Sequence, residues 1–196
     1  MGTLVALEPP APRLVEELER RWGIGVAENE AAAAFAAEIA YYKEHHLEGR
    51  DAASLAALRG RCAAVLHEAL PATARAAMTP AALEPALLAS LQFRLLPSVA
   101  ALLGAMRETG LKLAVVSNWD VSLGEVLERL GVAKLLDCVV TSAEVGAAKP
   151  DPAVFRRALE LLELRPEEVV HVGDSPRLDL AGAEAAGIRA ILIETS

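Results

Sequence analysis

The sequence has 196 residues, and its 27 acidic side chains outnumber its 19 basic ones to give a net charge of -8. This charge argues against a nucleic acid or an anionic membrane as partner, because like charges would repel over much of the surface. Cys62 and Cys138 are too few and too far apart for a disulfide framework, and no secretory signal is recognisable, so we expect a cytoplasmic protein with reduced thiols.

Residues 12–95 have a helical pattern throughout. Segments rich in alanine, leucine and glutamate alternate there with glycine and proline breakers, and none of them reads as a strand. From Pro97 onward, short β-branched runs alternate with helical repeats, which is typical of βαβ units and a parallel sheet. The sequence therefore predicts an α/β fold with a helical first part, and the boundary falls near residues 92–97.

The second part is predicted to form an open, doubly wound sheet. Four helices are expected. The first covers 99–106, and the second begins with a capping box formed by Ser122 and Glu125 and ends at Gly131. The third begins at Asp151-Pro152, and the fourth covers 181–186. Strands are expected at 113–116, 137–141, 169–172 and 190–193.

Three groups of polar residues directly follow predicted strands. They are Ser117-Asn118 in VVSNWD, Lys149 in AAKPDP, and Asp174 with Asp179 in HVGDSPRLDLAG. Ligands of such sheets bind at the carboxyl ends of the strands, so we expect these groups to line one cleft. Two carboxylates suit Mg²⁺, and a nearby lysine and serine would neutralise and orient a phosphoryl group. Singly, each group has a simpler interpretation, as a strand-end cap, a solvated loop charge or a helix N-cap.

Taken together, S-N, K-P-D-P and G-D-S-x-x-x-D-x-x-G-A within residues 97–195 resemble motifs two, three and four of the haloacid-dehalogenase-like hydrolase superfamily. The resemblance implies a Rossmann-like core at residues 96–196 and an α-helical cap at residues 12–95, inserted after motif one. Residues 1–11 would then hold a remnant of motif one and a linker.

The resemblance also implies a role for each residue of the three groups. Ser117 and Lys149 would be catalytic and, together with Asn118, would bind the phosphoryl group of the substrate. Asp174 would hold Mg²⁺, and Asp179 would support it.

Gly2-Thr3-Leu4 resemble the tail of motif one, which reads D-x-D-G-T-L or D-x-x-G-T-L and begins with the nucleophilic aspartate. Met1 then stands two positions after the nucleophile, which we expect to lie before residue 1, through either a mis-assigned start or a real truncation. The 196-residue chain is therefore expected to be inactive. It is also expected to be poorly stable, because the strand leading into motif one would be missing between the strands that end at Ser117 and Gly173.

The leading functional expectation is a Mg²⁺-dependent phosphatase that acts on a small phosphomonoester through an aspartyl-phosphate. Against it stands the lack of an aspartate at the Met1 position, which phosphatases of this family generally use to protonate the leaving group. One alternative is a haloacid-dehalogenase-type hydrolase, which attacks carbon with aspartate and does not need that acid. Its fourth motif, however, carries a serine-asparagine pair where this chain has Gly173-Asp174. A second alternative is a catalytically inactive binding or regulatory protein that keeps the anion and metal site.

Overall fold

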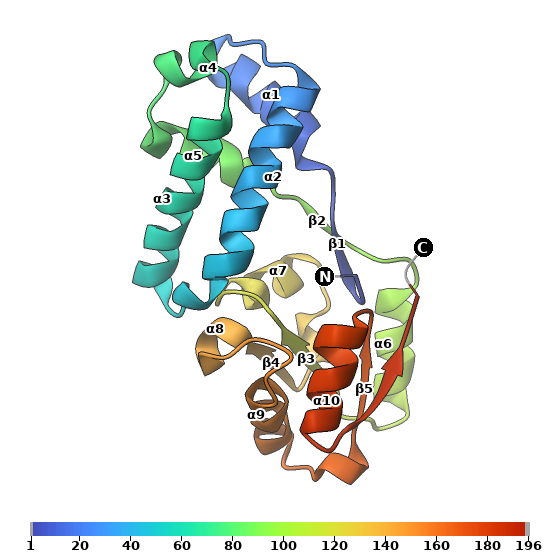
Figure 1. Cartoon of the computed structure of the whole chain (residues 1–196). Helices are drawn as coiled ribbons and strands as arrows, with labels where there is room; N and C mark the ends of the chain where they lie inside the picture. The colour runs from blue at the N-terminus through green and yellow to red at the C-terminus, as the bar shows by residue number, and fades with distance from the viewer. Residues whose placement is uncertain (1, 195–196) are drawn as a thin grey trace. The chain divides into compact units, whose positions relative to one another are not determined.

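The computed structural model describes residues 2–194, and these divide into two compact units (Figure 1). One unit contains residues 7–92 and is built almost entirely of helices. The other contains residues 2–6 and 93–194 and holds the parallel strands. The prediction of an α/β fold with helices packed on parallel strands is confirmed.

The helical unit consists of long helices packed side by side around an apolar core. Its elements are α1 (Pro10–Trp22), α2 (Glu28–His45), η1 (His46–Glu48), α3 (Ala52–Ala69), α4 (Ala72–Ala77) and α5 (Pro80–Ser90). Helix α2 packs against α1 and α3, and α5 packs against the same two helices. The starts of two helices are capped by side chains, since Asp51 accepts a hydrogen bond from the N–H of Ser54 and Thr79 accepts one from the N–H of Ala82.

Glu38 is a carboxyl group buried in the helical unit. It lies on α2, and only 4% of the residue is exposed. Burial raises its pKa above the ordinary value, and a hydrogen bond with Cys62 of α3 offsets only part of that rise. The folded unit therefore favours the protonated form of Glu38 more strongly than the unfolded chain does.

We expect Glu38→Gln to reduce the loss of stability that accompanies a rise in pH. Because the pKa of Glu38 is higher in the folded chain than in the unfolded chain, protonated Glu38 stabilises the fold. This contribution is fully present below the unfolded pKa of about 4.3 and is lost as the pH rises through the folded pKa. Urea unfolding, monitored by the circular dichroism of the helices at several pH values from about 5 to about 8, measures how steeply the free energy of unfolding changes with pH. Glu44→Gln, at an exposed position of the same helix, is the control. Equal slopes in Glu38→Gln and the parent chain would contradict the assignment.

The strands of the other unit form two parallel pairs. β3 (Ala114–Ser117) pairs with β4 (Cys138–Thr141), with Ser117 opposite Thr141. β5 (Val170–Gly173) pairs with β6 (Arg189–Leu192). Within residues 2–194 these pairs are separate ladders, whereas the sequence predicts one open sheet. The carbonyl of Val116 on β3 accepts a hydrogen bond from the Lys149 ammonium.

A third pair joins β1 (Val5–Leu7) to β2 (Phe93–Leu95). The N–H of Leu96 bonds to the carbonyl of Leu4, and the N–H of Glu8 bonds to that of Gln92, so the two segments run antiparallel. The prediction of helix up to residue 95 is therefore wrong for β2. Helix α5 ends at Ser90, and the pairing of β2 with a segment distant in sequence outweighs the local helical composition.

Helices cover the parallel pairs. They are α6 (Val99–Glu108), α7 (Leu123–Arg129), α8 (Ser142–Val145), α9 (Ala153–Leu162) and α10 (Ala181–Ala185), with short turns η2 (Ala133–Leu135) and η3 (Pro166–Glu168) and a wider helical turn η4 (Pro176–Leu180). Helix α9 packs against β3 and β4, and α10 packs against β6. The capping box predicted at Ser122 is not formed, since the Ser122 side chain accepts no bond from the first turn of α7, and the N–H of Ser122 instead donates to Asp120.

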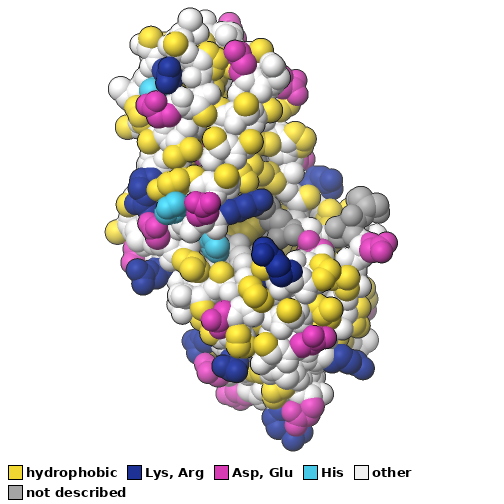
Figure 2. All heavy atoms as spheres, viewed as in Figure 1, with side chains coloured by type: hydrophobic (Ala, Val, Ile, Leu, Met, Phe, Trp, Pro, Cys, Tyr) yellow, Lys and Arg dark blue, Asp and Glu magenta, His cyan; other side chains and the backbone are white. Residues whose placement is uncertain are grey.

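None of the helices in residues 2–194 combines the length and the apolar character that crossing a membrane requires. Figure 2 shows acidic and basic side chains interspersed over the face drawn there. On that face the basic side chains do not gather into the continuous stripe that phosphate-backbone binding favours.

Candidate functional site

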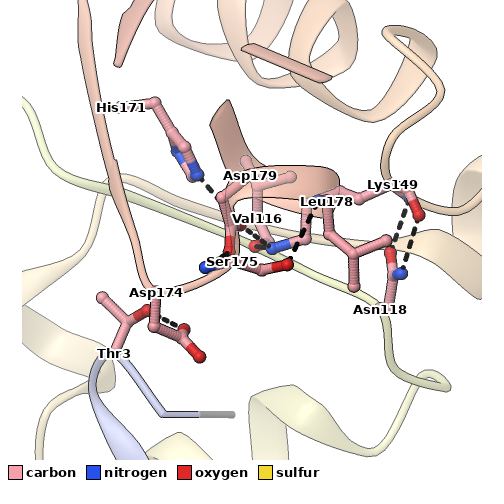
Figure 3. Close-up of polar contacts among 9 residues, drawn as sticks. All are labelled: Thr3, Val116, Asn118, Lys149, His171, Asp174, Ser175, Leu178 and Asp179. Carbon is pink, nitrogen blue, oxygen red and sulfur yellow. Dashed lines mark hydrogen bonds and ion pairs between the residues drawn. The ribbon is translucent and has the colours of Figure 1, made fainter. Parts of the chain in front are cut away.

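Lys149 lies in the loop before α9, and its ammonium group is held inside the unit of parallel strands. Its Nζ atom donates to Oδ1 of Asp179 at 2.6 Å and to the carbonyl of Val116 at 3.1 Å (Figure 3). The two side chains of the ion pair are only 12% and 7% exposed. Poor access to water strengthens the attraction between them and makes loss of either partner costly.

Asp179, on η4, accepts hydrogen bonds from three donors. Oδ1 receives Lys149 and the Nε2 of His171 at 3.1 Å, and Oδ2 receives the backbone N–H of Ser175 at 3.1 Å. Burial by itself raises the pKa of Asp179, but the bonds from His171 and Lys149 and the lysine charge outweigh it and hold the pKa well below the ordinary value. Asp179 is therefore ionised at neutral pH. Because an ionised carboxylate only accepts, Nε2 of His171 must carry the proton that it shares with Oδ1.

Asn118, directly after β3, contacts the backbone of Lys149 with both ends of its amide. Nδ2 donates to the carbonyl of Lys149 at 3.1 Å, and Oδ1 accepts the N–H of Lys149 at 2.7 Å. Its neighbour Ser117 ends β3, is half-buried, and lies between Asn118 and Val116. The end of β3 thus contacts both the backbone and the ammonium of Lys149.

Asp174 follows the end of β5 and contacts the N-terminal segment. Oδ1 accepts the hydroxyl of Thr3 at 2.6 Å, and the Cα of Gly2 lies so close that a methyl group there would overlap the carboxylate. The segment resembling the tail of motif one therefore contacts the first carboxylate of the segment resembling motif four. Figure 3 shows Asp174 and Thr3 beside the cluster formed by Lys149, Asp179 and His171.

Hydrogen bonds connect three of the residues singled out in the sequence, Asn118, Lys149 and Asp179. Ser117 is adjacent to Asn118, and Asp174 is adjacent to Ser175, whose N–H contacts Asp179. Two further residues belong to this neighbourhood: His171, which was not predicted to do so, and Thr3, which was identified only as part of the remnant of motif one. A histidine between two valines resembles a packed strand residue, and nothing in that pattern indicates its bond to Asp179.

The carboxylates differ in their capacity for a metal. The oxygens of Asp179 already face an ammonium, an imidazole N–H and a backbone N–H, so in this arrangement Asp179 supports Lys149 instead of a metal ion. Asp174 is half-buried and offers hard oxygen atoms, which suits Mg²⁺, an ion that commonly binds to one or two carboxylates and keeps several waters. No cluster of three or more His, Cys, Asp or Glu side chains suited to a metal occurs within residues 2–194.

The charges of the site favour the binding of a divalent cation first and of an anion only afterwards. Lys149 and Asp179 neutralise each other, so the ionised carboxylate of Asp174 would leave one negative charge. A phosphoryl group approaching Ser117 would be repelled by that charge, and a divalent cation at Asp174 would reverse its sign.

Comparison with known proteins gives a consistent result. The sequence pattern of the haloacid dehalogenase-like hydrolases matches residues 1–187. A bovine protein, haloacid dehalogenase-like hydrolase domain-containing protein 3, is 42% identical over 101 residues, which are 52% of this chain and 40% of the relative. A Thermus thermophilus protein named phosphoserine phosphatase is 40% identical over 104 residues, 53% of this chain and 42% of the relative. The matched regions thus span about two fifths of these relatives.

The fold is also shared with solved structures. The crystal structure of a HAD phosphatase from Thermococcus onnurineus superimposes with a TM-score of 0.63 at 24% sequence identity, covering 99% of this chain and 83% of that chain. At this identity the likeness concerns the fold alone.

Proposed function

The chain belongs to the haloacid dehalogenase-like hydrolase family, and from this premise we propose that it is a Mg²⁺-dependent phosphatase acting on a small phosphomonoester. The observation that carries the proposal is the ammonium of Lys149, which is held at the end of β3 by the carbonyl of Val116, the residue before Ser117, and by Asp179. With a divalent cation bound at Asp174, the site would carry net positive charge beside a strand-end hydroxyl, which suits a phosphoryl group better than a neutral substrate. The Thermus relative named phosphoserine phosphatase supports the same choice.

Each residue of the site has a role in this proposal. Ser117 donates its hydroxyl to a phosphoryl oxygen, and Lys149 places positive charge beside the transferred group. Asp179 holds the ammonium of that lysine in position. Asp174 would hold Mg²⁺, which supplies positive charge where negative charge develops.

We further propose that turnover requires an attacking aspartate from residues that precede Gly2. Its carboxylate oxygen would form a bond to phosphorus as the bond between phosphorus and the alcohol oxygen breaks, and the departing oxygen would take its proton from water. A second water would then hydrolyse the acyl phosphate, which releases phosphate and restores the carboxylate. Thr3 contacts Asp174, so a residue a few positions earlier is within reach of the same strand ends, since each residue spans at most about 3.5 Å.

Assays on three proteins test the proposal: the 196-residue chain, a version extended upstream by an apolar strand ending in D-x-x before Gly2, and the extended version with Asp174→Asn. We expect turnover of a generic phosphomonoester only in the extended parent and only with Mg²⁺. Asp174→Asn keeps an acceptor for Thr3 but removes the charge, and should lower Mg²⁺ affinity in calorimetry at least about tenfold.

Asp51→Asn is the matched control, because asparagine also caps helices and Asp51 belongs to the helical unit. Mg²⁺-dependent turnover by the 196-residue chain, abolished by Asp174→Asn, would show that another residue is the nucleophile. Phosphate binding without turnover in every form would instead favour an inactive binding protein.

A further inference from the structure

Asn118 was predicted from the family resemblance to bind substrate, yet its side chain contacts the protein's own backbone. Both bonds of its amide go to one residue, Lys149, which is 31 positions further along the chain (Figure 3). The N–H of Lys149 can only donate and its carbonyl can only accept. The orientation of the amide is therefore determined by its partners.

The same strand end also binds the other end of Lys149. The carbonyl of Val116, two residues before Asn118, accepts the ammonium group that pairs with Asp179. The lysine is thus held at its backbone by Asn118 and at its Nζ atom by Val116 and Asp179. Ser117, the last residue of β3, lies in the sequence between these two contacts, so its backbone belongs to the same strand end that holds the lysine.

From this geometry we infer that Asn118 is a positioning residue that acts on a bound anion through Lys149 and makes no contact of its own with the anion. If the amide turned to face a ligand, it would leave the N–H and the carbonyl of a half-buried residue without their partners. The part of this inference that concerns the anion rests on the proposed phosphatase function. The part that concerns the Lys149 loop does not.

Hydrogen exchange tests the loop independently of function. In Asn118→Ala, NMR-detected protection of the Lys149 N–H should fall at least about tenfold, while that of Val140, buried on β4, should be unchanged. Asn118→Asp keeps the Oδ1 acceptor and should retain more protection at Lys149 than Asn118→Ala does. Unchanged protection at Lys149 in Asn118→Ala would overturn the inference.

A double-mutant cycle tests the effect on the anion, with inorganic phosphate as the probe in the presence of Mg²⁺ and ³¹P NMR titration as the measurement. Asn118→Ala should weaken phosphate binding about threefold to tenfold in the parent chain and have no effect in a Lys149→Gln background. Lys149→Gln keeps a donor for Asp179 and so limits unfolding, and Lys134→Gln, at an exposed lysine, is the control.

The outcomes separate the two proposals. An equal loss in both backgrounds would show that Asn118 contacts the anion itself or only stabilises the fold, and would overturn the inference. If the parent chain binds no phosphate, the phosphatase proposal and the anion part of the inference both fail, whereas the exchange measurement still decides whether Asn118 holds the loop.

Discussion

Gly173→Ala is expected to lower the free energy of unfolding by about 3 kcal/mol. A methyl group at Gly173 would overlap the Cβ and Cγ atoms of Asp179 and lie 2.8 Å from its Oδ2 atom. Asp179 has little room to move, because it is buried and three donors hold its carboxylate. The strand end must therefore shift, or Asp179 must give up its partners.

Urea unfolding of the two chains measures this difference. Gly124→Ala is the matched control, since the added methyl group meets nothing within 4 Å and Gly124 lies inside α7. That change should stabilise the chain by about 0.5–1 kcal/mol, because glycine is a poor helix former. Equal unfolding midpoints for Gly173→Ala and the parent would show that Asp179 leaves room for a methyl group at Gly173.

The local sequence predicted much of this site because strand ends leave a clear pattern. An apolar run followed at once by Ser117-Asn118 indicates a strand that ends at the sheet edge, and Asp174 follows β5 in a similar way. These patterns, with the family resemblance, identified the α/β class and the residues to examine. They contain no information on which of those residues would contact each other.

The pairing of Lys149 with Asp179 shows why contacts were harder to predict. The two residues are 30 positions apart, and their contact depends on how the loop before α9 packs on the turn after β5. Two carboxylates in one segment suggest a metal site as long as the oxygens are free. In the folded chain, one of those carboxylates is occupied by donors from three different residues.

His171 shows a second limit of sequence patterns. Alternation along a strand tells which residues share a face, but not which face is covered. Val170 and Val172 are each 39% exposed, whereas the ring of His171 packs edge-on against Phe155, with the ring centroids 5.0 Å apart, and bonds to Asp179. The polar residue of this strand is thus the one turned inward.

The other large effect is expected for Asp179→Asn, which should lower the free energy of unfolding near pH 7 by about 3 kcal/mol. Asparagine has nearly the same shape and keeps one acceptor oxygen, but it leaves the ammonium of Lys149, only 12% exposed, without a countercharge. Urea unfolding at pH 7 measures the difference. Glu160→Gln, which breaks the solvent-exposed pair with Arg157, is the control and should change little.

The pH dependence of this variant provides a sharper test than its stability at one pH. Because the pKa of Asp179 is lowered in the folded chain, its contribution is present above the unfolded pKa of about 3.9 and is lost as the pH falls from there toward the folded value. The parent chain should therefore lose stability more steeply below about pH 4 than Asp179→Asn does. Other carboxylates with lowered pKa, such as Glu17 and Asp137, remain in both chains, so only the difference between the two slopes reports on Asp179. Identical acid slopes, with equal stability at pH 7, would mean that the ion pair with Lys149 does not stabilise the fold.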